Sequence, residues 1–66
     1  MPVKLYLMRV GTGGRILPQK IAEFADTPDM RVLARTMAYE RAYALRVNVM
    51  LTVPNFDPQI IAPFGD

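Results

Sequence analysis

The stretch D26-T-P-D-M30 decides the fold, because it marks where the one long helix begins. Thr27 stands before a proline, which favours the extended backbone that a helix N-cap adopts. Pro28 suits the first helical position, and the aspartates on either side add negative charge at the positive end of the helix dipole. We assign these two carboxylates to capping rather than to a catalytic or metal pair. The pattern predicts a helix from Pro28 to about Arg46, since no glycine or proline interrupts it.

The predicted helix carries a basic stripe and a wide apolar arc. Three arginines, Arg31, Arg35 and Arg46, share a stripe with Ala38 and Ala42, which we interpret as a solvated face. The apolar arc is too wide to be covered by one small sheet, so a second packing partner is implied, most simply another copy of the chain. The interface candidates on this arc are Met30, Leu33, Met37, Tyr39 and Tyr43.

Glu40 lies near the middle of this apolar arc, with no basic residue four positions away. A buried and unpaired carboxylate would cost several kcal/mol or take up a proton. We therefore expect a cation from another element or another subunit to meet Glu40 at an interface. The candidate cations are Arg9, Arg15 and Lys20.

Before the helix, the sequence predicts a strand, a turn and a short helix. Residues 3–10 combine β-branched, aromatic and long apolar side chains, as strands do. Gly11, Gly13 and Gly14 favour a hairpin turn, after which residues 15–17 pair briefly with the first strand. A proline and apolar residues at helical spacing predict two helical turns over residues 18–25.

After the helix, residues 47–53 alternate between apolar and polar side chains, which predicts a half-buried strand that ends at Pro54. Residues 59–62 form a candidate short edge strand. We expect the tail, residues 55–66, to lie against another subunit or a partner, because its large apolar side chains would be costly to leave in water. These interface candidates are Phe56, Ile60, Ile61 and Phe64. The expected fold is a single α+β domain spanning residues 1–66, in the order β-α-α-β-β, with one long helix packed on a small sheet.

Length and composition favour association. A chain of 66 residues buries a marginal core, and without cysteine or histidine it can form neither disulfides nor the usual zinc sites. A hydrophobic content of 52% supports self-association instead. The net charge of +2 permits contact with nucleic acid without requiring it. No apolar run approaches the ~18 residues of a membrane span, so we expect a cytoplasmic location or one within an assembled particle.

The residue inventory argues against an enzyme. Serine, cysteine and histidine are absent, which excludes the common nucleophilic triads and histidine general bases. The six carboxylates are scattered apart from the capping pair. We expect no catalytic residues, no metal and no cofactor.

Residues 9–24, RVGTGGRILPQKIAEF, resemble the strand, glycine-arginine turn and proline-started helix of swapped-hairpin DNA-binding proteins of the AbrB and MazE type. This resemblance implies a dimer that grips DNA through Arg9, Arg15 and Lys20. The helix arginines could add phosphate contacts. The nucleic-acid candidates are therefore Arg9, Arg15, Lys20, Arg31, Arg35 and Arg46.

The Met-Pro start resembles a second family, the tautomerases that use an amino-terminal proline, and implies Pro2 as a base. Our leading hypothesis is a small structural subunit that self-associates or docks into a larger particle, such as a phage or virion. A DNA-binding dimer is the first alternative, and a tautomerase is the second.

Overall fold

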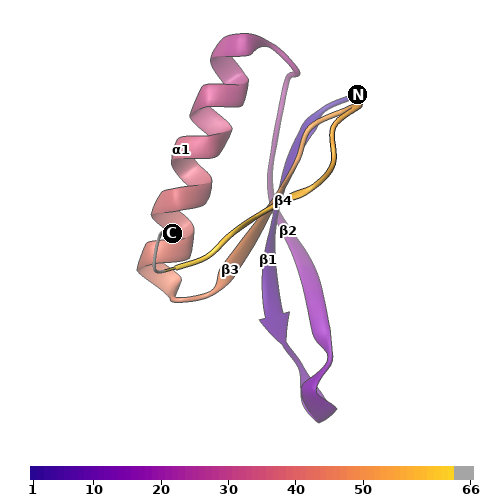
Figure 1. The fold of residues 1–66 in the computed structure, drawn as a ribbon, viewed down its shortest axis with the longest axis vertical. Coiled ribbons are helices and arrows are strands. Elements are labelled where there is room, and N and C mark those ends of the chain that lie inside the picture. The colour runs from indigo at the N-terminus through magenta and orange to yellow at the C-terminus, as the bar shows by residue number, and fades with distance from the viewer. Residues whose placement is uncertain (64–66) are drawn as a thin grey trace.

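A computed structural model describes residues 1–63 as one helix lying across one face of a four-stranded antiparallel sheet (Figure 1). The strands stand in the order β2-β1-β3-β4, so β1 and β3 are central and β2 and β4 are the edges. This confirms the α+β class. The elements are β1 Val3–Val10, the 3-10 turn η1 Thr12–Gly14, β2 Ile16–Phe24, α1 Pro28–Leu45, β3 Asn48–Thr52 and β4 Gln59–Ile61.

The segment that was expected to form a short helix, residues 18–25, is instead mostly strand β2, and that prediction was wrong. β2 pairs with β1 from Val3 opposite Phe24 to Val10 opposite Ile16. A bulge shifts the register beside Leu5, so Ile21 has no partner on β1. The extra residue changes the phase of the apolar alternation, which is why the spacing imitated a helix. Two isolated helical turns are only marginally stable, whereas pairing with β1 satisfies the backbone groups of β2 that face β1.

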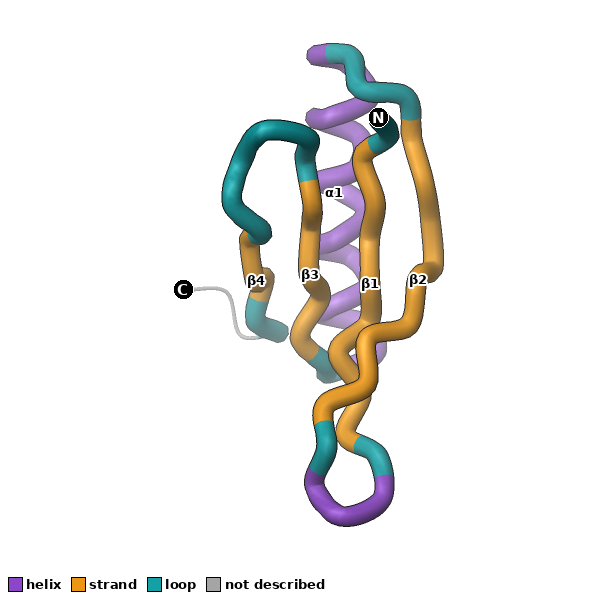
Figure 2. Tube along the Cα trace, turned by 90° about the vertical axis from the view of Figure 1, so that its right-hand side faces the viewer, coloured by secondary structure: helices purple, strands orange, loops and turns teal. Residues whose placement is uncertain are grey.

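The predicted hairpin turn is confirmed, and it lies at the end of a long projection. Gly13 and Gly14 both have φ of 78°, a region that glycine enters without steric cost. The N–H of Gly11 donates to the carbonyl of Arg15 across the turn at 2.6 Å. The paired strands continue past the end of α1 before they reach this turn (Figure 2).

The predicted start of the helix is also confirmed. Thr27 is the N-cap, and its Oγ1 accepts a hydrogen bond from the backbone N–H of Met30 at 3.2 Å. The helix ends at Leu45 because Arg46 takes a left-handed conformation, with φ of 56°. The chain then turns directly into β3, whose Val49 and Leu51 point into the core as the alternation predicted.

The core is a single layer between α1 and the sheet, and the helix contributes its smallest side chains. Ala34, Ala38 and Ala42 are buried against apolar residues of the three strands β1, β3 and β4, namely Val3, Leu5, Leu7, Val49, Leu51 and Ile61. The prediction that Ala38 and Ala42 belong to a solvated stripe was therefore wrong. The strands already supply large side chains, and a row of alanines lets the helix approach them closely. The wide apolar arc of the helix remains on the outside.

Candidate interaction surface and pocket

The sheet face opposite α1 carries apolar side chains that no element among residues 1–63 covers. Figure 2 views the sheet from this side, with the helix behind the strands. Because strand side chains alternate, this face carries the residues between the core positions. Tyr6 stands opposite Met50 on β3, and Met50 stands opposite Ile60 on β4. Met8 stands opposite Pro18 on β2. We call this set of five residues the open face.

The open face has an apolar centre and a charged rim. Ile60 is 54% exposed, while Tyr6, Met8 and Met50 are half-buried by their neighbours alone. The charges lie toward the end where β1 begins. There Lys4 stands opposite Glu23, and the Nζ of Lys20 lies 3.3 Å from Oε1 of the same glutamate. An apolar centre with a polar rim is the usual anatomy of a protein–protein interface.

The hairpin extends the open face into a two-stranded projection. β3 pairs with β1 only as far as Met8, so no third strand among residues 1–63 pairs with the segment from Arg9 to Leu17. We call this segment the hairpin arm. Its apolar residues are strongly exposed, including Val10 at 74% and Ile16 at 60%. An isolated two-stranded hairpin with apolar side chains in water gains stability when another surface covers it.

The outer face of α1 carries part of the predicted interface set. Leu33, Tyr39 and Tyr43 are exposed there, and Met30 and Met37 are half-buried at its margins. Glu40 is exposed, and among residues 1–63 no charged side chain is buried. The carboxylate of Glu40 therefore reaches water in the single chain. Its pairing with a cation of another subunit stays a prediction.

The tail only partly follows the prediction. Ile61 belongs to the core of its own chain at 7% exposure, so the prediction that it meets another subunit was wrong. It is buried because β4 pairs with β3 and directs Ile61 under α1, together with Val49. Ile60, its neighbour, points to the open face, and Phe56 is 65% exposed in the β3–β4 loop. Phe64 lies outside the described residues.

The structure does not gather the six predicted nucleic-acid residues into one patch. Arg9 and Arg15 lie on the hairpin arm, whereas Arg31 and Arg35 lie in the first half of α1, at the other end of the long axis (Figure 1). Lys20 is paired with Glu23 on β2, and Arg46 caps the far end of the helix. The molecule extends 37 Å along this axis, and these two arginine groups lie toward its opposite ends.

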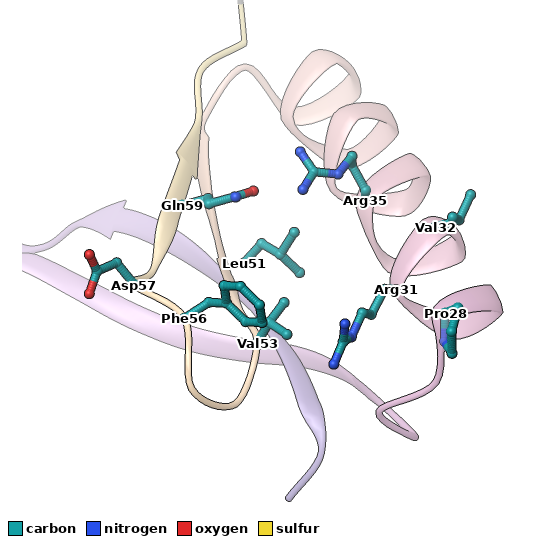
Figure 3. Close-up of a pocket in the computed structure, with 9 residues that line it drawn as sticks. All are labelled: Pro28, Arg31, Val32, Arg35, Leu51, Val53, Phe56, Asp57 and Gln59. Carbon is teal, nitrogen blue, oxygen red and sulfur yellow. The ribbon is translucent and has the colours of Figure 1, made fainter.

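A pocket of about 420 Å³ opens between the first half of α1 and the β3–β4 loop (Figure 3). Arg31 lies at one side of it and is held by two contacts. Its Nε donates to Oδ1 of Asp26 at 2.6 Å, and its guanidinium lies 5.7 Å from the centre of the Phe56 ring. The pocket is lined by Pro28, Arg31, Val32, Arg35, Leu51, Val53, Phe56, Asp57 and Gln59.

The pair of Asp26 and Arg31 shifts the ionisation of both groups. The hydrogen bond from Arg31 lowers the pKa of Asp26 below its usual value, with the nearby positive charge adding to the effect. The same hydrogen bond raises the pKa of Arg31. Both groups therefore stay charged over the ordinary pH range, which fixes a cation at the pocket wall.

Sequence reasoning did not anticipate this pocket. Arg31 and Arg35 were recognised as one stripe, but the apolar wall formed by Leu51 and Val53 comes from β3, and Gln59 comes from β4. Only the spacing of the two arginines at i and i+4 gave a local signal that their side chains project to the same side of the helix.

Pro2, the residue expected to act in a tautomerase, lies just before β1. It lines a shallow hollow of about 290 Å³ near Lys4, Tyr6 and Thr52. Within residues 1–63, no histidine, cysteine, aspartate or glutamate side chains cluster in a group that could hold a metal ion. No helix within residues 1–63 is long and apolar enough to cross a membrane.

Comparisons with protein-family models, with curated proteins and with solved structures give no match for this chain.

Proposed function

We propose that this chain is a small structural subunit that assembles with further copies of itself, and that the open face is the main contact. One observation carries the proposal: α1 covers one face of the sheet, and the other face has an apolar centre that no described element covers. The contact would be architectural rather than catalytic. Docking of the same face into a larger particle is compatible with this role.

The exposed surface of the chain exceeds the average for a compact monomer of its mass. The chain exposes 4775 Å². A compact monomer of 7.4 kDa is expected to expose about 4,200 Å². In this chain the helix contributes three alanines to the core, so apolar burial within the chain is limited. A standard interface buries about 800 Å² per partner, and we assign this contact to the sheet face together with the hairpin arm.

A two-fold pairing of open faces suits the distribution of side chains. Two sheets pack face to face at about 10 Å, with their apolar side chains interdigitating. Met50 lies on a central strand between Tyr6 and Ile60, so it would stand near the middle of such a contact. Lys4 and Glu23 would remain at the rim, where water can reach them. The arm of each copy would extend along its neighbour.

The DNA-binding alternative has weaker support from the geometry. The open face is mainly apolar, and Arg9 and Arg15 lie at the other end of the molecule from Arg31 and Arg35. Exposed Val10, Ile16 and Leu17 give the arm itself an apolar character beside Arg9 and Arg15. Apolar side chains of this kind favour a protein surface over a phosphate backbone.

Sedimentation equilibrium of wild type and Met50→Glu tests the proposal. We expect wild type to have a mass above that of a monomer and Met50→Glu to sediment as a monomer, because a carboxylate at the centre of an apolar contact would be desolvated without a partner. Circular dichroism verifies that the variant still folds. Leu33→Glu, which places the same charge on the outer face of α1, serves as the control and should keep the wild-type mass.

Two results would contradict the proposal. Wild type that is monomeric at all concentrations would exclude self-association. A folded Met50→Glu variant that keeps the wild-type mass would show that the copies contact each other elsewhere. If only Leu33→Glu lost association, the contact would lie on the outer face of α1.

A further inference from the structure

We propose that the pocket between α1 and the β3–β4 loop binds a small organic acid, with one carboxylate and an aromatic or branched apolar body. The pocket opens on the helix side of the sheet, away from the open face, so this inference does not depend on self-association. Its volume of about 420 Å³ falls in the range of small-molecule sites.

Arg31 provides a cation whose position is fixed before any ligand arrives. Asp26 engages only its Nε, and the ring of Phe56 supports the guanidinium. Among residues 1–63 no acceptor engages its two terminal Nη groups, so they can donate to a further acceptor. Because the side chain is already ordered by these contacts, binding an anion here would cost little conformational entropy.

Arg35 provides a second cation one helical turn away. It is exposed, and within the part of the chain that the structure describes it makes no ion pair. Two like charges at i and i+4 repel each other, so the pair of arginines favours an anion placed between them. In Figure 3 the guanidinium of Arg35 and the amide of Gln59 project toward the space above Leu51, from opposite walls.

Asp57, the one acidic residue within 1–63 that lines the pocket, does not neutralise this arrangement. The carboxylate of Asp57 is directed away from the arginines in Figure 3. Asp26 is engaged by the Nε of Arg31 and compensates one of the two cations. The charge of Arg35 is left to a ligand or to water.

The apolar lining of the pocket favours an organic acid over an inorganic anion. Leu51 is 1% exposed and Val53 is half-buried, so they form an apolar floor. Phe56 is 65% exposed, and its ring faces the open space of the pocket. A ligand with an apolar body would cover this ring, while its carboxylate would match the planar fork of a guanidinium.

Phenylacetate is a suitable probe, followed by amide chemical shifts of the full chain in a ¹H–¹⁵N titration. We expect saturable shifts confined to the pocket, at Arg35, Phe56 and Gln59. The neutral analogue 2-phenylethanol should bind about tenfold more weakly or worse, because it lacks the charge-assisted contacts. Acetate and inorganic phosphate should also bind more weakly than phenylacetate, because they lack the apolar body.

Arg35→Gln should weaken phenylacetate binding by about tenfold, whereas Arg41→Gln, which removes an exposed arginine outside this pocket, should leave it unchanged. Equal affinity for phenylacetate and 2-phenylethanol would overturn the proposal, as would equal loss in the two arginine variants. Tighter binding of phosphate than of phenylacetate would overturn the choice of ligand class, and shifts spread over the open face would show that the probe only coats apolar surface.

Discussion

At the scale of the residue, the segment that starts the helix serves two purposes. Thr27 caps α1 as the sequence predicted. Asp26, predicted only to complement the helix dipole, also accepts a hydrogen bond from Arg31. The cap could be predicted because it is a local pattern of neighbouring residues. The ion pair places Arg31 against Phe56, which is distant in sequence, and this contact could not be read from spacing.

The ion pair predicts a specific dependence of stability on acid. The pKa of Asp26 is lowered in the folded chain, whereas an aspartate in the unfolded chain has a pKa of about 3.9. Below that value the unfolded chain binds more protons, so the stabilising contribution is complete above about pH 4 and is lost as the pH falls through the folded pKa. Asp26→Asn should therefore lose less stability than wild type as the pH falls below about 4.

Urea melts at a series of pH values measure this effect. Arg31→Gln should reduce the acid dependence in the same way, because it removes the other partner of the same pair. An Asp26→Asn variant whose stability falls with acid as steeply as that of wild type would refute the assignment.

At the scale of the element, the helix buries the row of Ala34, Ala38 and Ala42 and leaves most of its larger apolar side chains exposed. Its bounds could be predicted from the cap and from the absence of glycine and proline, but its buried face could not. Helical periodicity showed an apolar arc containing Tyr39 and Tyr43. The large core side chains of the strands leave room for the helix only where it presents the alanine row that contains Ala38. β2 was missed for a related reason, since the bulge opposite Leu5 depends on pairing with β1 and leaves no local signal.

Enlarging a side chain on the buried row tests this orientation of α1. Ala38 is fully buried, so Ala38→Leu should lower the free energy of unfolding by about 1–3 kcal/mol through overpacking. Ala44→Leu, the same change on the exposed side of the helix, should alter it by no more than about 0.5 kcal/mol. Chemical denaturation at one protein concentration compares them, and the reverse order of effects would mean that the helix is rotated.

At the scale of the whole molecule, the sequence indicated that the chain has more apolar surface than its own core can hold. The structure locates that surface on the open face, the hairpin arm and the outer side of α1. The need for a partner followed from composition and length. The surface that would contact this partner could not be predicted. The open face combines residues from all four strands, and only the sheet order brings them together.

The contact between open faces is the central claim, and the methionine methyl groups test it most directly. Met8 and Met50 lie on the open face, whereas Met30 and Met37 belong to the helix layer. In a sample that mixes methyl-labelled and unlabelled copies, a filtered NOE experiment detects only contacts between copies. We predict intermolecular NOEs from the methyl groups of Met8 and Met50 and none from those of Met30 and Met37. Intermolecular NOEs from the helix methionines alone, or none from any of the four, would contradict this account.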